Sequence, residues 1–591
     1  MSTRAFGSDD TERNTFFPRL LGTRGAIATE HYLSAQAGAD VMKAGGNAVD
    51  GAVTAAFVEG VVNPQMYTIG GECPMLIHMA GSGKVVSVNG NTAAPGRATA
   101  AAYRARGLDE VPIEGILAAG VPAAFGALLT ALERFGTRSF AGVVEAARRL
   151  AGEGFAVHRG LLHQPKYGLE FLVPKFRERW PGSAALYLPG GRPPAECDVL
   201  RNPALASLFE SLAHLEGHAS GSREQKLQAV RDGFYRGDVA TEIDRFSRER
   251  EGFLVRSDLE RFETKLEEPA ALDFHDTTVF KCGPWNQGPV MLQALAILER
   301  FDLAAMGHGS ADYLHTVAEA IKLAFADREQ YYGDPDQVEV PLAGLLSKTY
   351  AQLRAELIDP ARANGELRPG DPANVEALLP ADERLGGAAW GAGTVHVDTI
   401  DRDGNMAAFT PSGGWIRSSE VIPALGFPLG NRLMTCYLEP AHHPGLVAPF
   451  RRPRTTISPS LAYRRGEPWM VFGSMGGDQQ DQWMLQFLLN RVVFGMNVQE
   501  AIEAPKFNSE HFPEYFAPHD FIPNRLRMEP RIAEDVRAEL ARRGHDLEIA
   551  GDWTEGYLLA AERNPDTGVL EAGCDPRGGK SDVFPAFALC W

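Results

Sequence analysis

Hydrophobic and polar residues follow two different periods in the first part of the chain. Residues 25–31 (GAIATEH) have the length and apolar content of a strand. The apolar spacing of residues 34–46 predicts a helix that ends at a glycine pair, where a left-handed cap favours glycine. Residues 47–62 are rich in Ala and Val and almost uncharged, so they predict a buried helix that ends at the Asn63-Pro64 pair.

Hairpin and helix signals follow. A glycine turn at 69–73 precedes two short apolar runs, 74–80 and 84–90, which GSG joins in the manner of a hairpin. From about Pro112 to Leu367 the apolar residues recur with the helical period. The clearest cases are residues 115–136, 140–154, 289–301 and 310–332. We therefore expect a helical layer in the middle of the chain.

The character of the sequence changes near residue 369. Residues 369–393 contain Pro, Gly and acidic residues with little periodicity, which indicates an exposed, cleavable connector. Two predicted strands, 394–400 and 406–410, follow around a DRDGN turn.

A later hairpin, residues 460–474, leads through the run SMGG into a predicted helix at 478–495, and the chain has no internal repeat. Helices early, strands late and then helices again predict a mixed α/β (α+β) fold with two sheets between helical layers.

Length and charge narrow the class of protein. A chain of 591 residues is long enough for two or three domains or for one large layered unit. Its formal net charge of −18 argues against nucleic acid or an anionic membrane surface as the main partner. The first 20 residues are polar, and no window reaches the roughly 18 apolar residues that span a bilayer. We expect a cytoplasmic protein.

The cysteines and histidines predict neither disulfides nor a metal site. No CxxC pair and no histidine at zinc-ligand spacing accompany Cys73, Cys197, Cys282, Cys436, Cys574 and Cys590. His442 and His443 lie in the Pro/Gly-rich run AHHPG, which we interpret as an exposed loop. No companion carboxylate stands nearby to complete a metal site with them. We expect no metal and no organic cofactor.

Thr394 is the candidate nucleophile. Strand periodicity places Thr394, His396 and Asp398 on one face. Gly393 supplies the permissive backbone that an intramolecular N→O acyl shift requires. A cut between Gly393 and Thr394 would free the threonine α-amine, which can then activate the hydroxyl without a histidine. The same pattern also fits a β-branched residue that merely begins a strand.

A glycine pair between a strand and a helix is the second candidate element. Gly476 and Gly477 follow the apolar run WMVFG and precede the helix that opens at Asp478. Free N–H groups at a helix start, with glycines that allow close approach, are what an oxyanion hole requires. A tight turn fits the pattern equally well. A phosphate-binding loop would need a following Lys-Ser/Thr pair, which is absent.

Six segments together resemble the gamma-glutamyltransferase family. They are GGNAVDGAVTAAFVEGVVNPQMYTIGGECPMLI, GTVHVDTIDRDGNMAAFT, PRTTISPSL, VFGSMGG, EAIEAPKF and GCDPRGG, in family order from about residue 24 to 580. The resemblance implies the four-layer αββα sandwich of the Ntn hydrolases and synthesis as a proenzyme. Self-cleavage would give a large chain, residues 1–393, and a small catalytic chain, residues 394–591, which remain associated in one compact unit.

The resemblance also implies roles for single residues. Thr394 would be the nucleophile, and Gly476 and Gly477 would donate hydrogen bonds to the oxyanion. A supporting hydroxyl would come from Thr410 or Ser412. The substrate would be a small-molecule amide.

The positions that hold glutamate in this family differ here. Asn91, in the run NTAAP, replaces the arginine that binds the α-carboxylate, and Thr92 replaces the adjacent glutamate. The aspartate that binds the α-ammonium is absent from residues 434–436, and Thr455 and Thr456 replace paired serines. A glutamyl zwitterion would lose both charged partners, and we therefore expect a different substrate.

These departures favour hydrolysis of a non-gamma-glutamyl amide. The runs NGNTAAPGRA and SMGGDQQDQ look more like the oxamate amidohydrolase-like branch of the family, with cephalosporin acylases as further neighbours. The short stretch between Cys436 and Thr455 suggests an open site. Arg454 or Arg417 is the candidate for binding a substrate carboxylate, although a solvated arginine fits the pattern too. Asp478 is a further candidate substrate-binding residue.

Two alternatives remain open from the sequence. The first is a gamma-glutamyltransferase or glutathione hydrolase with a rearranged glutamyl site. The second is a non-catalytic protein that binds an amide metabolite without turnover. The identity of the amide is not readable from these residues.

Overall fold

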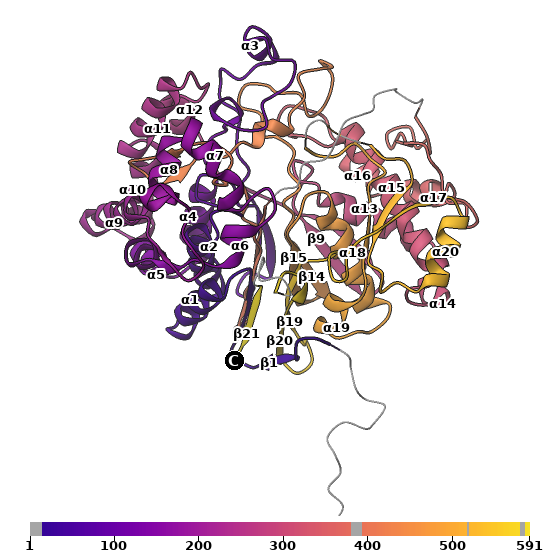
Figure 1. The fold of residues 1–591 in the computed structure, drawn as a ribbon. Coiled ribbons are helices and arrows are strands. Elements are labelled where there is room, and N and C mark those ends of the chain that lie inside the picture. Colours follow the sequence, from indigo (N-terminus) through magenta and orange to yellow (C-terminus); the bar gives the residue numbers. More distant parts are fainter. Residues whose placement is uncertain (1–14, 380–392, 517–518, 520, 580–585) are drawn as a thin grey trace, which may run out of the picture.

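Two β-sheets stand face to face at the centre of the molecule, and helices cover the outer face of each (Figure 1). The structure is a computed structural model that describes residues 15–379, 393–516, 519, 521–579 and 586–591. The layer order confirms the expected αββα sandwich. Most of the predicted connector, residues 380–392, and the polar start, residues 1–14, lie outside the described residues.

One seven-stranded sheet is antiparallel throughout, in the order β21, β2, β10, β11, β3, β4, β7. Its strands are β2 (Gly25–Thr29), β3 (Met75–Met79), β4 (Lys84–Asn89), β7 (Lys265–Glu267), β10 (Val397–Asp401), β11 (Met406–Phe409) and β21 (Phe587–Cys590). The predicted strand at 25–31 and the predicted hairpin at 74–90 are confirmed as β2 and the β3–β4 pair.

The facing sheet also has seven strands, in the order β1, β20, β19, β15, β14, β9, β8, and every pair is antiparallel. Its strands are β1 (Leu20–Gly22), β8 (Ala270–Phe274), β9 (Thr277–Lys281), β14 (Ser460–Arg464), β15 (Glu467–Ser474), β19 (Leu558–Arg563) and β20 (Leu570–Cys574). The β14–β15 pair confirms the hairpin predicted at 460–474.

Side-chain alternation explains how the sheets pack. In β2 and β10, Ile27 and Val397 belong to the core under the helices, whereas Ala28 and Ile400 belong to the core between the sheets. Successive residues of a strand point to opposite faces, so each strand is buried on both sides. Many side chains between the sheets are alanines, which lets the two sheets approach closely.

Helices α1 (Tyr32–Lys43) and α2 (Ala48–Val62) pack on the β2–β10–β11 face. Every residue of α2 is buried, which explains why it has only two charged residues, Asp50 and Glu59. Asn47 and Asp50 form a capping box at its start. Helices α4 (Ala124–Phe135), α5 (Phe140–Glu153), α9 (Pro203–His218) and α10 (Arg223–Tyr235) extend this layer outward (Figure 1).

Helices α13 (Pro289–Leu298), α15 (Ala311–Tyr331), α18 (Gln479–Val492) and α19 (Val498–Glu503) form the other outer layer. They confirm the helices predicted at 289–301, 310–332 and 478–495. No described helix is long and apolar enough to cross a bilayer.

Two predictions for the middle of the chain need correction. The single helix predicted at 115–136 is a short 3-10 turn (Ile116–Ala118) followed by α4. The backbone is already extended at Ala119, and Pro122 disfavours the helical conformation at the residue before it. The segment from Pro112 to Leu367 is also not purely helical, since it contributes the short strands β7, β8 and β9.

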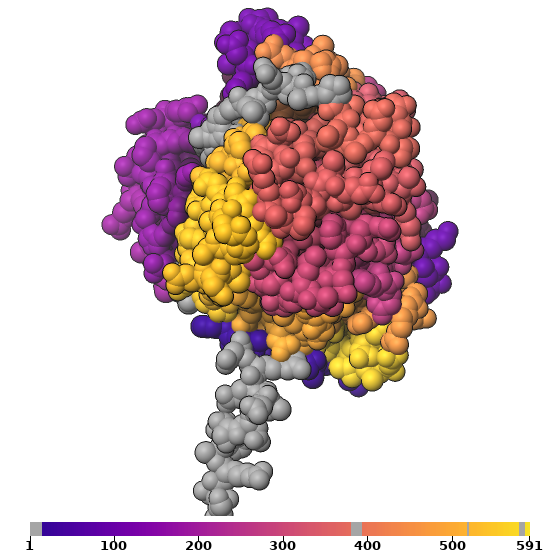
Figure 2. Space-filling view, turned by 90° about the vertical axis from the view of Figure 1, so that its right-hand side faces the viewer, coloured from indigo at the N-terminus to yellow at the C-terminus, as the bar shows by residue number. Residues whose placement is uncertain are grey.

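Residues on either side of Gly393 build both sheets. The first sheet takes β2, β3, β4 and β7 from before this point, and the second takes β1, β8 and β9. Segments from before and after Gly393 also adjoin each other at the surface. In Figure 2 the C-terminal segment, in yellow, adjoins the pink to salmon segment that contains α15 and α17 (Lys348–Ala355), and α20 (Glu534–Arg542) packs on α15.

Candidate active site

Thr394 lies buried just before β10, at one end of the inner pair of sheets. The predicted strand at 394–400 begins three residues late, because Thr394 makes only an isolated bridge to Ser412. The Oγ1 of Thr394 is 3.2 Å from the Oγ of Ser412. Backbone bonds between Ser412 and Glu72, 2.9 Å in each direction, fix the position of Ser412.

The carbonyl oxygen of Gly393 accepts two hydrogen bonds from side chains. The Ser412 hydroxyl donates at 2.9 Å, and the Trp415 indole N–H donates at 2.7 Å. Two donors at these distances draw electron density from the carbonyl carbon of the Gly393–Thr394 peptide. The hydroxyl of Thr394 therefore stands next to a polarised carbonyl, and this is the bond predicted to be cut.

The two hydroxyls named as candidate supports have different partners. Ser412 contacts Thr394, whereas Thr410 contacts the Nδ1 of His396 at 2.9 Å. The Nε2 of His396 is in turn 2.9 Å from a carboxylate oxygen of Asp398. Because both side chains of this pair are buried, burial raises the pKa of Asp398 to about 6, and His396 only partly offsets the rise.

The imidazole of His396 projects toward the facing sheet and meets β15 at Gly473. A Cβ on Gly473 would stand 2.2–2.4 Å from three atoms of that ring, so only glycine fits there. Thr394 comes two residues before His396, and Gly476 comes three residues after Gly473. The nucleophile candidate and the glycine pair are thus each a few residues from one direct contact between the sheets.

Gly476 and Gly477 form the turn between β15 and α18, as predicted. Gly476 has φ +114°, a backbone conformation that favours glycine. Asp478 anchors the turn with both carboxylate oxygens, since one pairs with buried Arg328 and the other accepts the Tyr515 N–H at 2.8 Å. Both carboxylate oxygens of Asp478, a candidate substrate-binding residue, are therefore bonded to other parts of the protein.

Arg432 and Glu72 are neighbours of Thr394 that the sequence analysis missed. Arg432 donates to the Ser412 Oγ at 3.1 Å and forms a buried ion pair with Glu72. Burial raises the pKa of Glu72, and Arg432 opposes that rise. The Nη1 of Arg432 is buried without a hydrogen-bond partner among the described residues. The signal that the sequence offered for this pair was a single arginine, Arg432, within the mostly apolar run LGNRLM.

Asn91, Thr455 and Thr456 are the next candidate substrate-binding residues. Asn91 is buried and donates to the Pro453 carbonyl. Thr455 and Thr456, which follow Pro453 closely in the sequence, are also buried. The Thr455 N–H donates to the Trp285 carbonyl at 3.0 Å.

The two candidate arginines also differ. Arg454 pairs with Glu329 at 3.0 Å, so its charge is already matched. Arg417 lies over the ring of Tyr167 at 4.0 Å and that of Trp415 at 4.7 Å. Burial lowers the pKa of Arg417 to about 10, and the nearby Arg432 adds to this effect. Positive charge therefore gathers around Trp415.

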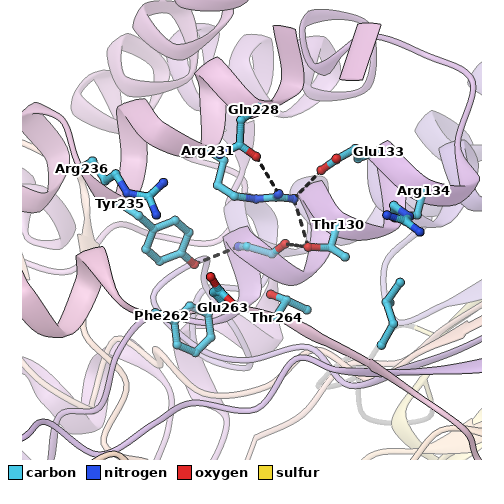
Figure 3. A pocket seen from close by; sticks show the side chains of 12 residues that line it. Thr130, Glu133, Arg134, Gln228, Arg231, Tyr235, Arg236, Phe262, Glu263 and Thr264 are labelled. Atoms are coloured by element: carbon cyan, nitrogen blue, oxygen red, sulfur yellow. Dashed lines mark hydrogen bonds and ion pairs between the residues drawn. The ribbon is translucent and has the colours of Figure 1, made fainter. Parts of the chain in front are cut away.

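A cavity of about 330 Å³ adjoins the glycine turn. Gly477, Trp483, Asn508 and Phe516 are among its lining residues. A second cavity, of about 270 Å³, lies in the helical layer around Arg231 and Tyr235 (Figure 3). Arg231 bonds there to Thr130 and Glu133, and no residue lining it is one of the predicted site residues.

One cluster of potential metal ligands occurs among the described residues, formed by His315, Glu319 and His545. The two imidazoles bond to each other at 2.8 Å, and Glu319 pairs with Lys322 and Arg368. These cations already neutralise the only carboxylate, so the donor set does not favour a further cation.

Comparison with known proteins gives a consistent result. The model of the gamma-glutamyltranspeptidase family matches residues 34–584. The glutathione hydrolase proenzyme of Escherichia coli (strain K12) is 30% identical over 96% of this chain and 92% of its own length. The acylase ACY 1 proenzyme of Pseudomonas sp. (strain SE83) is also 30% identical, over 94% and 92%.

Solved structures agree over the whole chain. The structure of LmbA2991HD is 41% identical, with a TM-score of 0.90 over 98% of this chain and 100% of that one. Cephalosporin acylase from Bacillus halodurans is 28% identical, with a TM-score of 0.83 over 100% and 99%.

Proposed function

The chain belongs to the gamma-glutamyltranspeptidase family and is an enzyme that acts on amide C–N bonds, and from this premise we propose that it is a self-processed hydrolase whose nucleophile is Thr394. Both curated relatives described above are proenzymes, which supports synthesis as a single inactive chain. The observation that carries the proposal is the polarised Gly393 carbonyl beside the Thr394 hydroxyl.

Processing begins with an attack on the chain itself. The Oγ of Thr394 bonds to the Gly393 carbonyl carbon, its proton passes to the Thr394 nitrogen, and the C–N bond breaks. The product is an ester between Gly393 and the threonine hydroxyl. Water hydrolyses this ester, which leaves a carboxylate on Gly393 and a free α-amine on Thr394. The chains 1–393 and 394–591 remain associated.

Substrate turnover uses the freed amine as the base. It takes the proton of the Thr394 hydroxyl while Oγ attacks the substrate carbonyl, and the N–H groups of Gly476 and Gly477 stabilise the oxyanion. The substrate amine leaves with the proton, and water then releases the acyl group from the ester. Transfer to an amine acceptor is a secondary route.

We propose that the acyl group is not gamma-glutamyl. The amide nitrogen of Asn91, which stands where the family has an arginine, donates to a backbone carbonyl, and residues 434–436 supply no carboxylate for an ammonium group. The positive charge lies instead at Arg432 and Arg417, close to Ser412 and Trp415. An amide whose acyl part carries a carboxylate matches this arrangement.

This view shifts the carboxylate-binding role away from Arg454, whose charge is paired with Glu329. Arg432 is paired with Glu72 as well, but its Nη1 is buried without a hydrogen-bond partner among the described residues and could still bind a substrate carboxylate. The direct test compares a neutral acyl anilide with one that carries a free carboxylate. Arg432→Gln should reduce the preference for the charged substrate, as a ratio of kcat/KM values per cleaved molecule, by about ten- to a hundredfold. An unchanged ratio removes Arg432 from substrate recognition.

A gamma-glutamyltransferase or glutathione hydrolase is the second candidate, and the 30% identity to the Escherichia coli glutathione hydrolase favours it. The deciding assay offers gamma-glutamyl anilide and simple acyl anilides side by side. We expect turnover of the simple acyl anilides and an acyl adduct on the peptide that begins at Thr394. Faster release from the gamma-glutamyl anilide would establish the second candidate.

A further inference from the structure

We propose that Trp415 is a catalytic residue of self-cleavage, in which its indole N–H stabilises the negative charge that forms on the Gly393 carbonyl oxygen. The inference rests on the proposed function, because it assigns a role within the processing step. Attack by the Thr394 hydroxyl turns that carbonyl oxygen into an oxyanion before the C–N bond breaks. The molecule thus contains a second oxyanion hole, separate from the glycine turn at 476–477.

The geometry of the two donors supports this role. The Trp415 Nε1 and the Ser412 Oγ stand 2.7 and 2.9 Å from the same oxygen. Distances of roughly 2.7–3.1 Å to the developing oxyanion are those of an effective oxyanion hole. Both donors are buried, so water does not compete for the oxygen.

Two consecutive glycines give the loop the shape that brings both donors to one atom. Gly413 and Gly414 lie between Ser412 and Trp415 and have φ +76° and φ +60°. A Cβ on Gly414 would stand 2.6 Å from the Gly71 nitrogen, so this conformation is also fixed by close packing. The run SGGW therefore directs a hydroxyl and an indole N–H to the carbonyl of the Gly393–Thr394 peptide.

Cations strengthen both donors. The guanidinium groups of Arg417 and Arg432 lie 4.7 and 5.4 Å from the centre of the Trp415 ring. A cation over the ring draws charge from the indole and makes its N–H more acidic. Arg432 also donates to the Ser412 Oγ, which polarises the O–H that Ser412 directs to Gly393.

This site acts on the bond before Thr394, whereas substrate meets the donors of the glycine turn. Replacement of Trp415 should therefore slow self-cleavage much more than it slows turnover by molecules that are already cut. In Trp415→Phe we expect the first-order rate of self-cleavage to fall about 10²- to 10³-fold, the usual effect of losing one oxyanion donor. The expected fall in kcat per cleaved molecule is less than tenfold.

The experiment follows the loss of the 591-residue band over time by denaturing electrophoresis and intact mass. Trp285→Phe is the matched control, because it removes another buried indole bond, to Glu267 at 2.7 Å, and should cleave at the wild-type rate. Trp415→His retains a ring N–H donor and should recover part of the rate. If Trp415→Phe melts at a much lower temperature than uncleaved Thr394→Ala, its slow cleavage could come from poor folding. The rate of Trp415→His then provides the test.

Each outcome has a definite reading. Wild-type cleavage by Trp415→Phe overturns the inference and leaves the proposed function intact. Equal losses in self-cleavage and in kcat overturn it as well, because they indicate a general role in the site. A folded Trp415→His that cleaves no faster than Trp415→Phe has the same consequence. Failure of the wild-type chain to cleave contradicts the proposed function itself.

Discussion

Ser412 touches both sides of the peptide that links Gly393 to Thr394. Its oxygen is 3.2 Å from the threonine Oγ1, and its hydroxyl donates to the Gly393 carbonyl. Thr410 serves a different pair, the His396–Asp398 couple between the sheets. We expect Ser412→Ala to slow self-cleavage about a hundredfold, as loss of one oxyanion donor does, and Thr410→Val to slow it much less. Equal effects of the two substitutions, in a time course of band conversion, would contradict this assignment.

Asp398 makes the stability of the protein depend on pH. Its pKa of about 6 lies above the value it has when exposed, so the folded state binds the proton more tightly. The stabilisation from this group is complete below about pH 4 and is lost as the pH rises through 6. It amounts to about 3 kcal/mol at most. Asp398→Asn should therefore gain stability relative to the wild type between pH 4 and 7.

Denaturant unfolding at several pH values measures the gap, which is the free energy of unfolding of Asp398→Asn minus that of the wild type. A gap that stays constant from pH 4 to 7 would mean that Asp398 keeps an ordinary pKa. If the free energy of unfolding of Asp398→Asn falls relative to that of the wild type as the pH rises, His396 dominates the couple and keeps Asp398 charged.

Single residues differ in how far they could be predicted from sequence. Thr394 could be chosen because it follows a connector and begins a β pattern. The approach of Trp415 to Gly393 depends on the fold of the SGGW loop, which local pattern does not reveal. Arg432 is similarly hidden, since its partner Glu72 is 360 positions away. Arg454 looked available in the sequence, but its partner Glu329 comes from a distant helix.

At the scale of elements, the residue just before β10 contacts β15, where the His396 ring lies against Gly473. The His396 imidazole is held on both sides, by Thr410 and Asp398, so it cannot move away from an added methyl group on Gly473. Gly473→Ala should lower the free energy of unfolding by about 3 kcal/mol, the upper end for overpacking. His396→Ala should relieve most of this cost in the double variant.

Gly217→Ala is the matched control, because a Cβ there meets nothing within 4 Å. Its position within α9 predicts a slight gain in stability. Thermal unfolding of the four variants gives the coupling between positions 396 and 473. Additive effects of the two substitutions would mean that the sheets do not depend on this contact.

Elements were predictable where one period continues for many residues. The helices at 289–301 and 310–332 were confirmed for that reason. The helix predicted at 115–136 was wrong because Pro122 interrupts a continuous apolar pattern. The strands β7, β8 and β9 were missed because they are short and lie among long helices, where the helical period dominates any window.

At the scale of the whole molecule, strands from before and after Gly393 pair with one another in both sheets. β10 pairs with β2 on one side and β11 pairs with β3 on the other. Separation of the two predicted chains would break five strand pairings, which would expose edges of nine strands and the cores on both faces. We expect the chains to co-elute in size-exclusion chromatography after cleavage and to part only in denaturant. Separate elution in native buffer would contradict this prediction.

The layer order was predictable from the two kinds of periodicity together with the family resemblance. The strand order within each sheet was not, because it depends on pairings between segments hundreds of residues apart. β1 and β20 are one example, and β21 beside β2 is another.

The central claim is that the chain cuts itself before Thr394. Intact mass and denaturing electrophoresis of the purified protein, beside Thr394→Ala, test it most directly. The account predicts two chains of 393 and 198 residues (591 − 393) in the wild type and a single chain in the variant. One uncut band in both proteins, or the same cut in both, would contradict it.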